Sequence, residues 1–296
     1  ALLDVSFASQ LRSDEAAVEQ LERFVRGRRV LVLSGAGIST DSGIPDYRGP
    51  GRVTRTPMRY QEFIGSEGNR RRYWARSSIG WPMTASATPN PSHDAVARLE
   101  RCGVVQHVLT QNVDGLHQRA GSRSVLELHG SLATVICLDC GTRSARSRLQ
   151  ERIAAANPGF ADGVARDDVA PDGDVEIPDA LAASFQVPAC EACGGTLKPD
   201  VVFFGENVPK GRVERGWAMV DGADAVVVLG SSLTVFSGYR FVRRAREQAK
   251  PIAIVNAGPT RGDGDASLKL DVRLAPLLPN VASRVAAAAR GGRNDA

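Results

Sequence analysis

The sequence predicts an α/β protein built on a Rossmann-like parallel sheet with helices on both faces, joined to a smaller second domain. Three observations predict it: short aliphatic runs alternate with amphipathic helical patterns, a Gly-x-Gly turn follows the first run, and two Cys-x-x-Cys pairs interrupt the alternation. Strands that alternate with helices are typical of open parallel sheets, because parallel strands need crossover connections.

The first elements are a helix, a strand and a glycine turn. Residues 13–27 begin with a serine, carry apolar residues at helical spacing and end on a C-cap candidate, Gly27. Residues 29–33 are an aliphatic run that leads into Ser34 and Gly35. This pattern indicates a buried parallel strand that feeds a tight turn.

The remaining strands are predicted by similar aliphatic runs. Helical patterns lie between them, at residues 92–101 and 238–250. The runs that predict strands are residues 104–109, 125–128, 225–229 and 252–255.

Two segments depart from this alternation. Residues 50–85 are rich in arginine and aromatic residues and favour helix, whereas residues 134–200 carry the cysteine pairs. We expect both segments to be insertions that form the small domain, as a helical module and a zinc-ribbon module. The Rossmann-like domain then comprises residues 1–49, 86–133 and 201–296.

Composition excludes several classes of protein. The chain has 296 residues, 43% hydrophobic and 24% charged, with a net charge of +4, as in ordinary globular proteins. Arginine clusters at residues 70–72 and 243–244 are too sparse for a nucleic-acid stripe, and solvated helix faces explain them. We therefore expect no nucleic-acid partner. No apolar run approaches the length of a membrane span, so we expect no membrane partner either.

The cysteine pairs predict a structural zinc ion. Cys137, Cys140, Cys190 and Cys193 form two Cys-x-x-Cys knuckles, and a glycine follows each knuckle. Four thiolates can hold the ion in a closed tetrahedral site. Cysteines that bind metal and do not form disulfides indicate a reducing compartment. A pair of redox-active dithiols is the alternative, but the surrounding sequence lacks a thioredoxin-like βαβ pattern.

The turn after the first strand has the chemistry of a pyrophosphate site. Gly35 and Gly37 would let the backbone approach the phosphates, and a helix that starts there would offer free N–H groups. The third glycine of the usual fingerprint is absent, since Thr40 stands in its place. A tight strand-to-helix turn without a ligand is therefore an alternative interpretation.

Polar residues follow several predicted strands at their carboxyl ends, where ligands bind in open α/β sheets. These are Asn112, Asp114, His129, residues 230–232 and Asn256. Helix capping by Asp114 and a structural role for His129 are the alternatives. Because four strands deliver polar residues or glycine to one edge, we favour a shared ligand site.

Taken together, these residues resemble the sirtuins, and finer features resemble class II, the group that contains the animal mitochondrial lipoamidase and ADP-ribosyltransferase. The matching pieces are in family order from about residue 13 to about residue 280. They include residues 35–39, 43–48, 110–114, 129–130, both cysteine pairs, 198–206, 230–232 and 255–256. The class II features include residues 73–76, 80–82, 170–174 and 237–240.

The resemblance implies an NAD-dependent protein-lysine deacylase that releases nicotinamide and O-acyl-ADP-ribose. His129 would be the general base for a ribose hydroxyl, and Asn112 would position the ribose and water. A protein mono-ADP-ribosyltransferase is the alternative, and a non-catalytic NAD-binding module is a further one. We expect a cytoplasmic, monomeric enzyme whose partners are acylated lysines in proteins.

The resemblance also implies the NAD site. Ile44 and Asp46 would line the nicotinamide pocket, Arg48 would touch the phosphates or ribose, and Asn256 would hold the adenosine half. The full set of implied NAD-binding residues is Gly35, Ala36, Gly37, Ser39, Ile44, Asp46, Tyr47, Arg48, Gln111, Asn112, Asp114, Gly230, Ser231, Ser232, Asn256, Ala257, Gly258 and Leu274.

Substrate contacts follow from the same resemblance. Residues 202–206 and 233–236 would clamp the peptide by strand addition. Tyr73 and Arg76 resemble the Tyr-x-x-Arg pair with which class III sirtuins hold acyl carboxylates, so acidic or bulky acyl groups could be preferred; a surface arginine beside a core tyrosine is the alternative. The implied substrate residues are Tyr73, Arg76, Val202, Phe203, Phe204, Gly205, Glu206, Leu233 and Val235.

Overall fold

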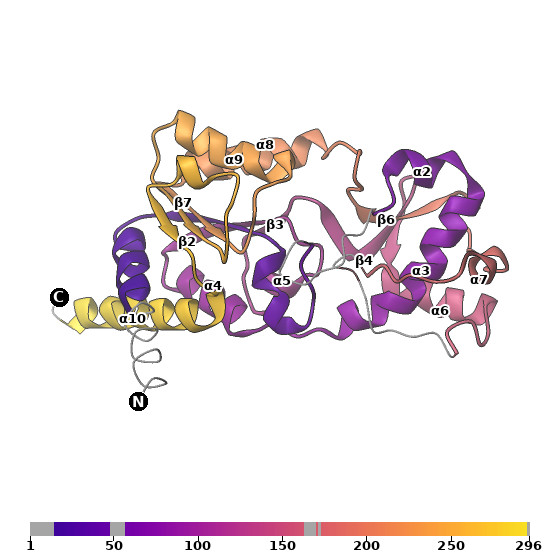
Figure 1. The fold of residues 1–296 in the computed structure, drawn as a ribbon, viewed down its shortest axis with the longest axis horizontal. Helices are drawn as coiled ribbons and strands as arrows, with labels where there is room; N and C mark the ends of the chain where they lie inside the picture. Colours follow the sequence, from indigo (N-terminus) through magenta and orange to yellow (C-terminus); the bar gives the residue numbers. More distant parts are fainter. Residues whose placement is uncertain (1–14, 48–56, 163–169, 171–172, 295–296) are drawn as a thin grey trace.

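A six-stranded parallel sheet forms one end of the molecule and a three-stranded antiparallel sheet forms the other (Figure 1). The computed structural model describes residues 15–47, 57–162, 170 and 173–294. The larger sheet has the order β3-β2-β1-β7-β8-β9, and helices cover both faces, which confirms the predicted fold class. Its strands are β1 (Val30–Ser34), β2 (Val105–Thr110), β3 (Val125–Glu127), β7 (Ala225–Leu229), β8 (Ile252–Val255) and the edge strand β9 (Leu268–Leu270), which the sequence did not predict.

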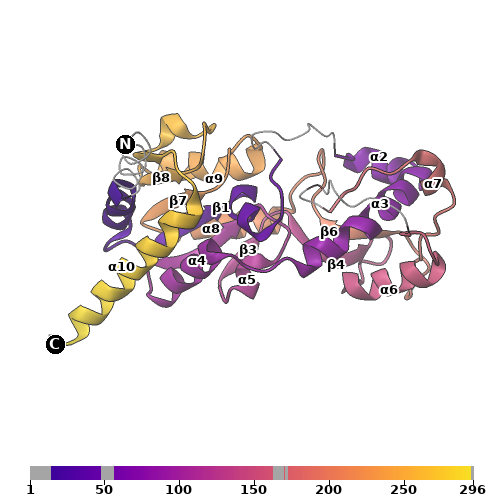
Figure 2. The same ribbon diagram turned by 60° about the horizontal axis from the view of Figure 1, so that its bottom comes forward.

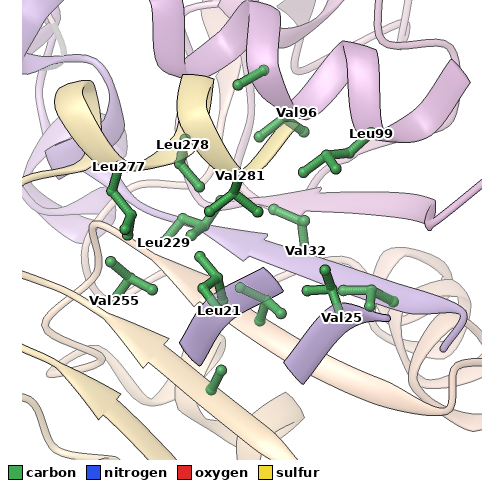
Figure 3. Packing of buried hydrophobic residues seen from close by; sticks show 14 of the residues in the cluster. Leu21, Val25, Val32, Val96, Leu99, Leu229, Val255, Leu277, Leu278 and Val281 are labelled. Atoms are coloured by element: carbon green, nitrogen blue, oxygen red, sulfur yellow. The ribbon is translucent and has the colours of Figure 1, made fainter. Parts of the chain in front are cut away.

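The central strand β1 is buried at every position and apolar from Val30 to Leu33, because both of its faces are covered. Val30 and Val32 face one helical layer, and Leu31 and Leu33 face the other, as alternation along a strand requires. Figure 3 shows Val32 in the first of these layers, together with Leu99 and Val281. The helix over residues 15–25, α4 (Pro91–Arg101) and α10 (Leu274–Asn294) cover the valine face. The opposite face is covered by α8 (Lys210–Gly222) and α9 (Phe236–Glu247).

The three-stranded sheet has the order β5-β4-β6 and carries the cysteines. Its core includes the buried side chains of Phe63, Trp74 and Phe203, and the buried Arg146 guanidinium lies over the rings of Trp74 and Trp81. This sheet lies at the opposite end of the molecule from the end of α10 (Figure 2). The strands of this sheet are β4 (Gly130–Cys137), β5 (Arg143–Ala145) and β6 (Leu197–Val201). The helices that share its core are α2 (Tyr60–Gly65), α3 (Glu67–Ser86), α6 (Arg146–Ala156) and α7 (Asp179–Ala183).

One local expectation is wrong. The chain does not enter an α-helix after β1 but makes two three-residue 3-10 turns, η1 (Ala36–Ile38) and η2 (Thr40–Ser42). The side chain of Asn90 donates hydrogen bonds to Ile38 O and Ser42 Oγ, which ties both turns to the start of α4. A 3-10 turn this short has no α-helical macrodipole, so phosphate binding here would depend on backbone N–H groups and side chains.

Candidate active site

The four cysteines meet in one cluster at the end of the three-stranded sheet. Their sulfur atoms all lie within 4.8 Å of one another, with Cys137 and Cys193 separated by 3.6 Å and Cys140 and Cys190 by 3.8 Å. A tetrahedral Zn²⁺ with bonds of about 2.3 Å gives sulfur separations of about 3.8 Å, so the geometry fits a structural zinc site. None of the four cysteines lines the large cavity described next.

A cavity of about 1140 Å³ lies between the two sheets. Its walls come from the carboxyl ends of β1, β2, β7 and β8 on one side and from α3 and the residues after β6 on the other. It is larger than the usual range for small-molecule sites, which suits a dinucleotide together with a second substrate. Every NAD and substrate residue proposed above lines this cavity except Arg48, which lies outside the described residues.

The glycine turn forms the floor of the nucleotide half. Gly37 N donates a hydrogen bond of 2.8 Å to Gly230 O, so the turn after β1 lies directly against the turn after β7. A Cβ atom on Gly37 would lie 2.8 Å from the same carbonyl, and one on Gly35 would lie 2.7 Å from Ser231 Cβ. Both glycines are therefore needed for the close approach of two loops, whatever ligand binds above them.

Asn112 and Asp114 belong to one hydrogen-bonded network with Ser39. Asn112 Nδ2 donates to Gly35 O and to Ser39 Oγ, both at 3.1 Å, and Ser39 Oγ donates to Asp114 at 2.8 Å. The other carboxylate oxygen of Asp114 accepts the backbone N–H of Leu116 in an Asx turn, whereas the N-cap of the helix that follows is Gly115. The network fixes the Asn112 amide at the cavity wall.

His129 is held in a defined tautomer. Its Nδ1 lies 2.9 Å from the carbonyl oxygen of Gln111, which can only accept, so Nδ1 carries the proton. Nε2 then presents its lone pair, and the hydroxyl of Ser237 lies 2.8 Å away and donates to it. Burial lowers the pKa of His129, and the positive charges of Arg212 and Arg240 lower it further. The ring is therefore neutral near pH 7 and can accept a proton at Nε2.

The residues after β7 connect the two halves of the cavity. Gln111 Nε2 donates to Ser231 Oγ at 2.7 Å, and the Ser231 hydroxyl oxygen accepts the backbone N–H of Leu233. Leu233 has a φ of 56°, in the left-handed region that non-glycine residues seldom adopt, and its side chain is buried under α9.

At the far end of the cavity Tyr73 and Arg76 line the wall, but Arg76 already has acidic partners. Its guanidinium makes a bidentate contact with Asp174 and a further one with Glu176. Tyr73 packs edge-to-face against Phe63 and also contacts the ring of Phe203, so the core-tyrosine alternative describes part of its role.

The predicted peptide segments face each other across the same cavity. Residues 202–206 follow β6, where Val202 N bonds to His129 O and Glu206 accepts from Phe203 N. Glu206 also pairs with the buried Lys198 at 3.0 Å, which anchors this segment to the small sheet.

Several cavity residues were missed in the prediction of the site. Ser237 and Arg240 belong to a class II sequence feature, yet their place beside His129 depends on how α9 packs. Asp174 belongs to another such feature, and Phe236 is an exposed aromatic residue at the cavity. The remaining ones are Thr40, Asp41, Pro57, Met58, Val113, Val201, Val208, Pro259, Val272 and Arg273, whereas Thr234 and Phe236 belong to the predicted peptide segment 233–236.

Within the described residues, no helix is both long and apolar enough to cross a membrane.

Comparison with known proteins places the chain in a family. A model of the Sir2 family matches residues 35–237, which is more than half of the chain. An NAD-dependent protein deacetylase 1 of Streptomyces coelicolor is 54% identical over 88% of this chain and 87% of the relative. The mitochondrial NAD-dependent protein lipoamidase sirtuin-4 of Homo sapiens is 48% identical over 90% of this chain and 86% of the relative.

Solved structures agree. One Sir2 enzyme superposes with a TM-score of 0.72 at 31% identity, over 93% of this chain and 99% of the other. A complex of Sir2 with a p53 peptide and NAD+ gives 0.71 at 29% identity, over 92% of this chain and 98% of the other. The resemblance read from the motifs is thereby confirmed, and the chain belongs to the Sir2 family, the sirtuins, a family of NAD-dependent protein deacylases.

Proposed function

We propose that this sirtuin removes acyl groups from protein lysines, consuming NAD and releasing nicotinamide and O-acyl-ADP-ribose. The observation that carries the proposal is the neutral His129 ring, whose Nε2 lone pair lies at the wall of a cavity with a nucleotide half and a peptide half. The names of the bacterial and animal relatives support the same reaction class.

NAD would supply the activated glycosidic bond at which the acyl oxygen reacts. In this proposal His129 accepts a proton at Nε2 from a ribose hydroxyl that takes the place of the Ser237 hydroxyl. Asn112 would orient the ribose or water through its fixed amide. The glycine turn would lie beneath the phosphates, although the N–H groups of Gly35 and Gly37 already donate to backbone carbonyls. Holding both reactants in one cavity supplies the proximity that a weak amide nucleophile needs.

The remaining assignments extend the family resemblance to residues that line the cavity. Ile44 and Asp46 would hold the nicotinamide, Ser231, Ser232 and Asn256 the adenosine, and residues 202–206 with 233–236 the peptide. The proposed preference for acidic acyl groups stays a prediction, and the two carboxylates bound to Arg76 count against it in the simplest form.

The test is turnover of an acetyl-lysine peptide with NAD, followed by mass spectrometry of both products. His129→Ala should reduce kcat/KM roughly 10²- to 10⁴-fold while NAD binding persists, because loss of a general base removes that much. His107→Gln is the matched control, since His107 lies on β2 and bonds to Ser124 away from the cavity. Near-normal turnover by His129→Ala would contradict the proposed role.

The same assay separates the alternative. Labelled NAD distinguishes a deacylase, which puts the label on O-acyl-ADP-ribose, from a mono-ADP-ribosyltransferase, which puts it on a protein side chain. Label on protein without deacylated peptide would favour the transferase.

A further inference from the structure

The Arg76 guanidinium is held by two carboxylates from residues 173–177, near the end of the insertion between the two cysteine pairs. Nε and Nη2 of Arg76 donate to the two oxygens of Asp174 at 2.7 and 2.6 Å, and Nη2 also donates to Glu176 at 2.6 Å. The side chains of Arg76 and Asp174 are only 10% and 15% exposed, whereas that of Glu176 is 59% exposed.

The segment that supplies these carboxylates is fixed by packing. Residues 173–177 alternate like a strand: Asp174 and Glu176 face Arg76, while Val175 and Ile177 are buried in the core of the small sheet. This part of the insertion therefore contributes apolar side chains to the core of the small sheet.

Backbone contact with α3 adds to the anchoring. A Cβ atom on Gly80 would lie 2.2 Å from Gly173 O, so only glycine allows α3 to lie this close to the segment. Ala170 N also donates to Asp174 O at 2.8 Å, which closes a turn around Gly173. The Asp174 carboxylate is thus positioned by groups other than Arg76.

We propose that Asp174 determines acyl specificity by occupying the hydrogen-bonding edge of the Arg76 guanidinium. The terminal carboxylate of a dicarboxylic acyl group would bind the same edge. The inference deepens the proposed deacylase function and depends on it for its biological meaning. A planar guanidinium binds one carboxylate bidentately through a given edge, so an acidic acyl group must displace Asp174 to use that edge. Uncharged acyl groups face no such competition.

Asp174 and not Glu176 carries this role because of their different positions. Asp174 engages two guanidinium nitrogens and lines the cavity together with Tyr73 and Arg76. Glu176 engages one nitrogen, is exposed to solvent, and is not part of the cavity wall. Glu176→Gln is therefore a matched control: it removes the same charge, two residues away, from the same arginine.

The test measures binding, so that it does not require turnover. Fluorescein-labelled peptides bearing acetyl-lysine or glutaryl-lysine are titrated with each variant, and the ratio of the two Kd values is compared. Asp174→Asn should move this ratio toward glutaryl-lysine by roughly tenfold, about 1.4 kcal/mol, since a charge-assisted competitor is replaced by a neutral amide. Glu176→Gln should move it by less than about threefold.

Two further variants test the cause of the expected shift. Adding Arg76→Met to Asp174→Asn should cancel the gain for glutaryl-lysine, because the released guanidinium is its cause. Asp174→Ser removes the same carboxylate and should give the same shift, which guards against a folding defect peculiar to asparagine; thermal unfolding identifies any such defect.

An unchanged ratio in both folded Asp174 variants, or an equal shift in Glu176→Gln, would overturn the inference. The kinetic ratio of kcat/KM values for the same peptides then tests the proposed function separately. Absence of turnover on every acyl-peptide with NAD would refute the deacylase function, whereas the binding ratio would still decide the part played by Asp174.

Discussion

Replacing Ser237 by alanine should lower the pKa of His129 further. The Ser237 hydroxyl lies 2.8 Å from His129 Nε2, and it donates to the neutral ring because the Nδ1 proton is directed at the Gln111 carbonyl. When the ring is protonated, the same hydroxyl can rotate and accept a hydrogen bond from Nε2–H, and this charge-assisted bond is the stronger of the two. Loss of the hydroxyl therefore makes protonation harder.

The magnitude follows from two quantities. A hydrogen bond to a charged group is stronger than one to a neutral group by about 1 kcal/mol, and one pKa unit corresponds to about 1.36 kcal/mol, so the pKa should fall by about 0.7 unit. Burial remains the largest cause of the low pKa of His129, and it persists in the variant. The pKa should therefore stay below its ordinary value.

The assay is the pH dependence of kcat/KM on an acetyl-lysine peptide between pH 5 and pH 8.5. This parameter reports ionisations of the free enzyme, which is the state described here. The acidic limb should move to lower pH by about 0.7 unit in Ser237→Ala, whereas Ser237→Thr keeps the hydroxyl and should leave it in place. A limb that is unmoved in Ser237→Ala, or that moves to higher pH, would refute the assigned hydrogen bond or the base itself.

Three other predictions rest on single features. Gly37→Ala should destabilise the fold by about 1–3 kcal/mol in urea unfolding and weaken NAD binding in calorimetry, because its Cβ would lie 2.8 Å from Gly230 O; a variant as stable as the wild type would contradict that contact. Removal of zinc by a chelator should unfold the three-stranded sheet and abolish activity indirectly, and full activity in protein shown by metal analysis to be zinc-free would exclude a structural ion. Burial lowers the pKa of His93 to about 4 and that of His117 to about 3, below the unfolded value near 6.5, so the unfolded chain binds more protons in this window. The free energy of unfolding should consequently fall as pH drops below 6.5, by up to about 1.4 kcal/mol per pH unit for each ring, and a constant urea midpoint from pH 7 to pH 5 would count against buried neutral rings.

Features set by local sequence were predictable. The aliphatic runs of β1, β2, β7 and β8 gave the parallel sheet, and the spacing of the cysteines gave the metal cluster. The polar residues at the carboxyl ends of these strands do line one cavity, because parallel strands deliver their ends to one edge. Their individual roles remain proposals.

Features set by contacts between distant segments were not predictable. The helix expected after Gly37 gives way to 3-10 turns because Asn90, far along the chain, binds their carbonyl and hydroxyl groups. The partner of Arg76 lies 98 residues away, in a short segment whose position against α3 local sequence does not determine. The donor to His129 lies 108 residues away, at the start of a helix whose placement depends on packing.

The left-handed backbone at Leu233 has a consequence for the energetics of binding. This conformation costs a leucine on the order of 1 kcal/mol, and burial of the side chain under α9 holds it in place. Since folding has already restricted this residue, little conformational entropy is left to lose when ligands arrive on either side of it. The bend between Ser231 and Val235 therefore separates the cofactor half of the cavity from the peptide half. It sets the distance between the two halves before a ligand binds to either.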